Sequence, residues 1–205
     1  LEKAGVGFLF APNYHPAFKA VAGVRKQLAE RGVRTIFNKI GPLMNPAKPQ
    51  CQLVGVFDRE MCPAFAEILQ RLGRESAWAV HGTTGDGRSV DELSLMGSSR
   101  ICKAGLYQDL EDEEVRPRDF GMKHAEVDEL QGGDAEVNAG ILEAILSGKD
   151  TGPKRDMVLL NAGAAIACCG LADDIGDGIE ISRRLIDDGS ALDRLRLLQD
   201  VAKRS

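Results

Sequence analysis

The sequence lacks the features that mark several classes of protein. Its formal net charge is -5 and only 5% of its residues are aromatic. A general nucleic-acid binder needs a basic face to neutralise phosphates, so a nucleic-acid partner is disfavoured. No uninterrupted apolar run approaches the roughly 20 residues of a membrane span, and the N-terminal segment lacks the pattern of a signal peptide. We therefore expect a cytoplasmic protein with no membrane partner.

The cysteines do not describe a disulfide framework. There are five, an odd number, and none forms a CxxC pair. Cys168 and Cys169 lie in the apolar run Ala164–Gly170. This setting favours small buried hydrophobic side chains in a reducing compartment over a redox or metal-binding role.

The chain nevertheless has enough apolar residues for one sizeable core, since 43% of its 205 residues are hydrophobic. Short apolar runs alternate with longer amphipathic stretches, which predicts a single α/β domain over residues 1–205, a mixed or mostly parallel sheet flanked by helices. The expected strands are Gly7–Phe10, Arg34–Phe37, Leu53–Phe57, Ala77–His81, Glu92–Leu95 and Ser99–Lys103. The expected helices are Pro16–Glu30, Met61–Leu72, Ala135–Ser147, Lys154–Cys169, Asp174–Asp188 and Ser190–Lys203. The acidic run Glu111–Glu114 is expected to be a solvated turn.

A first candidate site follows the expected strand that ends at Phe10. Along the helix expected after it, Phe18, Val21, Ala22 and Arg25 share the i, i+3, i+4, i+7 spacing, so Arg25 falls on the apolar stripe. A guanidinium there could grip a small carboxylate substrate beside an aromatic wall. Spacing alone favours the alternative of an internal salt bridge, or of a side chain that extends its charge to solvent.

A second candidate site is the glycine-rich loop that runs from His81 to the adjacent carboxylates Asp91 and Glu92. Carboxylates are preferred ligands of Mg²⁺, which retains water and bridges to phosphates. Taken alone, the pair is more simply an exposed acidic turn, and the loop has no Walker A lysine. In a further segment, Gln131–Ala139, Asp134 is expected to cap a helix rather than help form a phosphate site.

Taken together, several segments resemble the anthranilate phosphoribosyltransferases, which are glycosyltransferases related in fold to the pyrimidine nucleoside phosphorylases. The matching segments, in chain order, are GVGFLFAPNYHPAFK, VRKQL, RTIFN, GPLMNP, QLVGVFD, AVHG, DELS, GGDAEVNA and GPKRDMVLLNA. The resemblance implies that this chain is the C-terminal portion of the large α/β domain of that family.

The resemblance also implies roles for individual residues. Arg25 would bind the carboxylate of anthranilate, and Pro12, His15 and Phe18 would line the same pocket. Asp91 and Glu92 would help to hold Mg²⁺ against the diphosphate. The implied reaction is transfer of a phosphoribosyl group from phosphoribosyl diphosphate (PRPP) to the amine of anthranilate, a step of tryptophan and hence aromatic amino acid biosynthesis. The alternatives are a related phosphoribosyltransferase or nucleoside phosphorylase with another acceptor, and a non-catalytic relative that binds nucleic acid.

The sequence also departs from the family pattern. The family's glycine-rich phosphate-binding loop and its dimer-forming helical domain lie upstream of Leu1. We therefore expect a piece of a longer, homodimeric protein and no activity from this piece alone. Met44 replaces a small polar residue, and the turn after Arg25 is slightly long. The loop between Gly82 and Asp91 is also longer than usual, which could displace the metal ligands.

Overall fold

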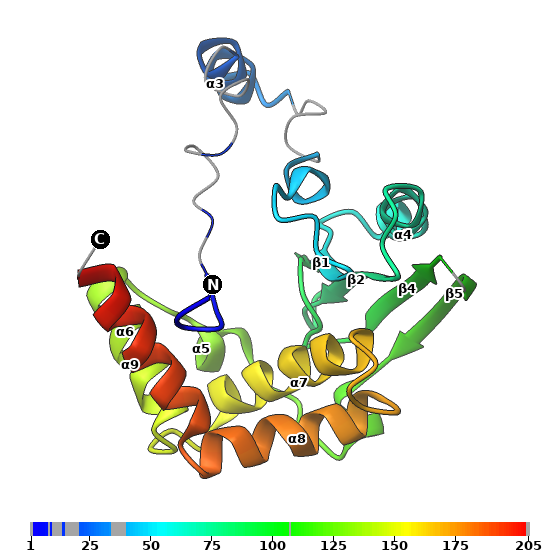
Figure 1. Ribbon diagram of the computed structural model, residues 1–205. Coiled ribbons are helices and arrows are strands. Elements are labelled where there is room, and N and C mark those ends of the chain that lie inside the picture. Colours follow the sequence, from blue (N-terminus) through cyan, green and yellow to red (C-terminus); the bar gives the residue numbers. More distant parts are fainter. Residues whose placement is uncertain are drawn as a thin grey trace.

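The computed structural model describes residues 2–7, 9, 14, 21–33, 40–106 and 108–203, with the side chains of Ala22, Arg25 and Ala29 outside the description. Within these residues a sheet carries helices on both faces, so the predicted α/β class with a mixed sheet is confirmed (Figure 1). The helical elements are α3 (Ala22–Glu30), η2 (Gly41–Met44), η3 (Arg59–Met61), α4 (Cys62–Arg71), η4 (Pro117–Phe120), α5 (Val127–Leu130), α6 (Ala135–Leu146), α7 (Pro153–Cys168), α8 (Ile175–Asp187) and α9 (Ser190–Lys203).

The sheet has the order β1-β2-β4-β5, with a short strand β3 attached to β2. The strands are β1 (Cys51–Gly55), β2 (Ser76–Thr83), β3 (Ser89–Val90), β4 (Ser99–Gly105) and β5 (Gln108–Val115). Among the strand pairs of the described residues, only β1–β2 is parallel, and the other pairs are antiparallel. β1 and β2 therefore end at the same edge of the sheet.

The alternation of side chains along the strands divides the core into two layers. One layer joins Val54, Ala77 and Ala79 to Phe65 and Leu69 of α4. The other layer, larger and on the opposite face, joins strand residues to the helices that follow the sheet in the chain. Its members include Trp78, Val80, Ile101, Leu159, Leu160 and Ile179. The C-terminal helices α7 and α8 thus contribute to the layer on this face of the sheet.

The helical layer is built outwards from α7, which lies on the sheet (Figure 1). α8 crosses α7 where Gly163 and Gly178 meet, and a Cβ on Gly163 would lie 2.7 Å from the backbone nitrogen of Ile179. α9 follows α8 and packs against α6. The predicted cap of α6 is confirmed, because the Asp134 carboxylate accepts hydrogen bonds from the backbone N–H groups of Glu136 and Val137.

Two secondary-structure predictions are wrong. The acidic run Glu111–Glu114 lies within the edge strand β5, where Asp112 pairs with Arg100 and Glu113 pairs with Lys103 of β4. These pairs neutralise charges that would otherwise disfavour a strand. The segment Glu92–Leu95 is not a strand, and its backbone bonds to side chains instead.

One burial prediction is also wrong, because Cys169 is exposed at the end of α7 while Cys168 is buried. The expected strand Arg34–Phe37, residues 8 and 10 of the first strand, and the beginning of the helix Pro16–Glu30 lie outside the described residues. The remaining expected strands and helices are present, with boundaries shifted by a few residues.

Candidate active site

The candidate site lies at the edge of the sheet where the parallel strands β1 and β2 end. Open α/β sheets bind ligands at the carboxyl ends of their strands. The buried ring of His81 joins these two ends, because its Nδ1 lies 2.9 Å from the backbone oxygen of Val56. The polar groups at this edge are thus positioned by buried strands.

The long loop after Gly82 folds back on itself before the chain reaches the acidic pair. Gly82 pairs with Val90 and Thr83 with Ser89, which makes β2 and β3 an antiparallel hairpin. At its tip the Arg88 guanidinium lies 2.9 Å from the Asp86 carboxylate. Hydrogen bonds from Thr84 and Arg88 lower the pKa of Asp86 to about 2. The hairpin returns the chain to the strand end, immediately before Asp91.

Two glycines let the acidic segment lie directly on the sheet. A Cβ on Gly55 would collide with the backbone carbonyl oxygen of Asp91, and a Cβ on Gly82 would collide with that of Glu92. Gly55 and Gly82 alternate with Val54 and His81, so both point to the face of the sheet that α7 covers. The segment from Asp91 therefore passes between the sheet edge and α7.

The carboxylates themselves remain at the surface. Asp91 and Glu92 are exposed, and Glu92 lies at the rim of a cavity of about 830 Å³ lined by residues of α5, α6 and α7. Partial desolvation at this rim, together with the negative charge of Asp91, raises the pKa of Glu92. The resulting site consists of two adjacent carboxylates beside a largely apolar cavity.

This donor set fits Mg²⁺ but not a metal enclosed by protein ligands. Among the described residues, no cluster of three or more His, Cys, Asp or Glu side chains could hold a metal ion. Mg²⁺ typically takes one or two carboxylates, keeps several waters and completes its shell with substrate phosphates. Two adjacent exposed carboxylates match that requirement.

The segment that follows the carboxylates is fixed by side chains that the sequence analysis did not identify. Leu93 and Leu95 are fully buried. The hydroxyl of Ser99 accepts a hydrogen bond from the backbone N–H of Ser94 at 2.9 Å. The side-chain amide of Asn161 bonds to both the N–H and the carbonyl of Leu93. The available signal was that Asn161 alone interrupts the run of apolar and glycine residues from Met157 to Cys168.

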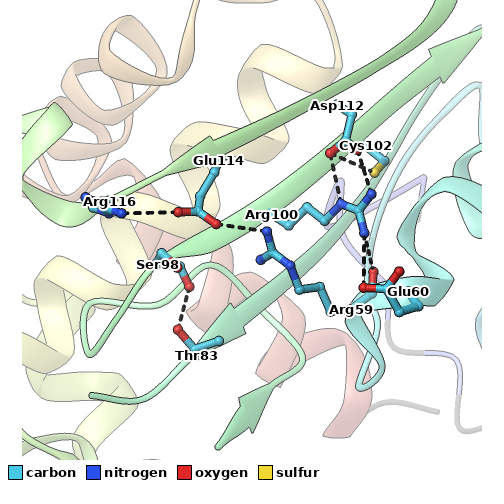
Figure 2. Close-up of polar contacts among 9 residues, drawn as sticks. All are labelled: Arg59, Glu60, Thr83, Ser98, Arg100, Cys102, Asp112, Glu114 and Arg116. Atoms are coloured by element: carbon cyan, nitrogen blue, oxygen red, sulfur yellow. Dashed lines mark hydrogen bonds and ion pairs between the residues drawn. The ribbon is translucent and has the colours of Figure 1, made fainter. Parts of the chain in front are cut away.

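Arginines near this edge are already paired with carboxylates (Figure 2). Arg100 binds Asp112 through two hydrogen bonds of 2.9 and 2.6 Å, and Arg59 lies 2.8 Å from Glu114. The bond from Arg100 lowers the pKa of Asp112. These contacts tie both β4 and η3 to β5, so both guanidinium groups support the sheet instead of presenting an open cationic site.

The side chains of the remaining predicted site residues lie outside the described part of the chain. Pro12, His15 and Phe18 lie outside the described residues, and Arg25 is described only through its backbone in α3. Figure 1 shows α3 standing clear of the sheet. The structure therefore describes Asp91 and Glu92 at the edge of the sheet, while their metal-binding role and the acceptor pocket stay predictions.

Comparison with known proteins identifies the family. The model described as "Glycosyl transferase family, a/b domain" matches residues 1–192. The chain belongs to this family. It is also 44% identical over 198 residues to an anthranilate phosphoribosyltransferase of Anaeromyxobacter sp. (strain K), covering 97% of this chain and 56% of that protein. The resemblance inferred from the sequence is confirmed.

Solved structures agree with this assignment. The anthranilate phosphoribosyltransferase of Thermus thermophilus superposes with a TM-score of 0.84 at 39% identity, over 98% of this chain and 56% of the other. The Saccharomyces cerevisiae enzyme in complex with PRPP and Mg gives a TM-score of 0.78 at 26% identity, over 93% of this chain and 51% of the other. The chain thus spans about half the length of the relatives that it matches. None of the described helices has the length and apolar character needed to cross a membrane.

Proposed function

We propose that the protein containing this chain transfers the phosphoribosyl group of PRPP to the amine of anthranilate and releases diphosphate. The observation that carries the proposal is the placement of Asp91 and Glu92 at the carboxyl edge of β1 and β2, in a chain 44% identical to an anthranilate phosphoribosyltransferase. Ligand sites of open α/β sheets lie at such edges.

Asp91 and Glu92 would hold Mg²⁺, directly or through water. When bound, the ion would neutralise charge that develops on the departing diphosphate. The chain's own contribution would be to fix the backbone of these two carboxylates at the sheet edge, since it lies against Gly55 and Gly82. Such preorganisation avoids the cost of rearranging charged groups during the reaction.

Arg25 would bind the carboxylate of the acceptor, with Pro12, His15 and Phe18 forming the surrounding wall. A guanidinium can bind a carboxylate through two parallel hydrogen bonds and so fix its direction. The aromatic amine of anthranilate is weakly basic, so it requires positioning near the sugar more than deprotonation. Arg25 would supply that positioning from the opposite end of the acceptor.

We further propose that the full-length protein is a cytoplasmic homodimer that pairs through a helical domain outside this chain, and that the 205-residue chain alone is inactive. In support, the matched relatives are nearly twice as long as the chain.

An acceptor screen with the full-length protein tests the function. We expect PRPP consumption with anthranilate in the presence of Mg²⁺, and none after addition of EDTA. Faster transfer to a nucleobase, or phosphorolysis of a nucleoside, would support a related transferase or phosphorylase instead. Salt-dependent DNA binding without any transfer would support the non-catalytic alternative.

A further inference from the structure

Asn161 of α7 holds the backbone of Leu93 in the way that a neighbouring strand would. Its Oδ1 accepts a hydrogen bond from the Leu93 N–H at 2.9 Å, and its Nδ2 donates one to the Leu93 carbonyl at 2.9 Å. Nδ2 also donates to the carbonyl of Met157 at 3.1 Å, one turn earlier in α7. All three hydrogen bonds of the Asn161 side chain are therefore made to backbone groups.

This arrangement explains why the segment after Asp91 is ordered without being a strand. Leu93 is fully buried, so its N–H and carbonyl need partners inside the protein. The strand predicted over Glu92–Leu95 would have found them in the sheet. Instead, the Asn161 amide is the partner of both the Leu93 N–H and the Leu93 carbonyl. The peptide can therefore lie outside the plane of the sheet, with Glu92 exposed to solvent.

We propose that Asn161 is a positioning residue for the metal-binding carboxylates, acting through the Leu93 peptide that directly follows Glu92; this rests on the proposed role of Asp91 and Glu92 in binding Mg²⁺. Three residues contact the segment from Asp91 to Leu93. Gly55 and Gly82 contact its backbone on the sheet side, and Asn161 binds the Leu93 peptide on the α7 side. Removing the amide leaves the sheet contacts in place but frees the segment on its helix side.

The chain contains a matched control for this role. Asn138 of α6 makes the same pair of bonds to another backbone unit, accepting from the Gly133 N–H at 2.9 Å and donating to the Gly133 carbonyl at 2.8 Å. Gly133 belongs to the turn before α6 and carries no carboxylate at the sheet edge. The two asparagines thus make the same pair of backbone bonds at different places in the fold, and Asn161 adds a third bond to the Met157 carbonyl.

The test compares Asn161→Leu, Asn161→Gln and Asn138→Leu. In the full-length protein with PRPP, Mn²⁺ binding is measured by electron paramagnetic resonance, together with the KM values for PRPP and anthranilate. In parallel, amide hydrogen exchange is followed at Leu93 and at Gly133.

We expect Asn161→Leu to speed exchange at Leu93, to weaken Mn²⁺ binding by about tenfold or more, and to leave the anthranilate KM within about twofold. Asn161→Gln keeps both amide groups and should restore most of the affinity.

Asn138→Leu should speed exchange at Gly133 and leave Mn²⁺ affinity unchanged. The proposal is overturned if Asn161→Leu folds and binds Mn²⁺ as the wild type does, or if both Leu variants weaken binding equally. If Asn161→Leu does not fold, Asn161→Gln decides: faster exchange at Leu93 with wild-type Mn²⁺ affinity would refute the role. Wild-type protein that binds Mn²⁺ but transfers nothing to anthranilate would contradict the proposed function while leaving this test intact.

Discussion

The backbone carbonyl of Asp91 lies so close to Gly55 that position 55 has no space for a Cβ atom. This contact joins the end of β1 to the segment that carries both candidate metal ligands. A methyl group there must push the segment away from the sheet or distort the strand.

We therefore expect Gly55→Ala to lower the free energy of unfolding by about 1–3 kcal/mol, the usual cost of overpacking, and to weaken Mg²⁺ activation. Gly140→Ala is the control, because Gly140 lies inside α6 with open space around its Cβ position. That substitution should stabilise the protein by roughly 0.4–1 kcal/mol. Urea unfolding of the two variants measures both effects, and equal destabilisation would show that the contact at Gly55 is not the cause.

The Arg100–Asp112 pair should make stability depend on pH in the acid range. The guanidinium lowers the pKa of Asp112 below its unfolded value of about 3.9. The pair's contribution to the free energy of unfolding is therefore complete above the unfolded pKa of Asp112. It is lost as the pH falls through the lower pKa that Asp112 has in the folded state. Asp112 is 46% exposed, so we expect Asp112→Asn to cost only about 1 kcal/mol at pH 7.

The cost of Asp112→Asn should nearly vanish once the pH is well below the folded pKa, which urea unfolding across the acid range would reveal. Asp193→Asn serves as a control for charge, since Asp193 contacts Arg196 only at 3.4 Å on an exposed surface. A cost for Asp112→Asn that stays constant with pH would contradict the assignment.

The cysteines should differ sharply in reactivity. Burial raises the pKa of Cys62 and Cys168 to about 11 and that of Cys102 to about 12. Cys169 is exposed. Because the thiolate is the reactive form, alkylation at pH 7.5 should label Cys169 first. Peptide mass spectrometry after brief iodoacetamide treatment would locate the label, and Cys169→Ser should remove the fast phase. Rapid labelling of Cys102 in folded protein would refute the burial argument.

The proposed contact between Arg25 and anthranilate predicts that an Arg25 variant loses affinity for anthranilate but not for PRPP. In the full-length protein, Arg25→Ala should raise the KM for anthranilate by about tenfold or more, as expected when a charge-assisted hydrogen bond of about 1.5–3 kcal/mol is lost. The KM for PRPP should change much less. Arg25→Lys keeps the charge without the planar pair of donors and should recover only part of the affinity. Equal changes in both KM values would argue against contact with the acceptor.

Many of the helices could be predicted because their signals are local. Asp134 marks the beginning of α6, Gly73 with φ +83° follows α4, and apolar spacing defines the buried faces. The strand β5 was missed because its residues are acidic, and only pairing with Lys103 and Arg100 makes a strand favourable there. Local sequence does not contain that information.

The candidate site also has residues that the sequence indicated and residues that only the folded structure reveals. Asp91 and Glu92 were identified through their place in a family pattern. Asn161 lies 68 residues from Leu93, and Gly55 lies far from Asp91 in the sequence, so their roles follow only from the folded arrangement. The metal-binding role of Asp91 and Glu92 remains a prediction, as do the roles of Pro12, His15, Phe18 and Arg25.

The most direct measurement is the Mg²⁺ dependence of phosphoribosyl transfer by the full-length protein and by its Asp91→Asn, Glu92→Gln double variant. The wild type should be activated by Mg²⁺ with anthranilate and PRPP as substrates. The double variant should be folded and should require far more Mg²⁺ or lose turnover, because it lacks both carboxylates at the end of the sheet. Equal activity of the two proteins at limiting Mg²⁺ would contradict the central claim that this acidic pair holds the metal.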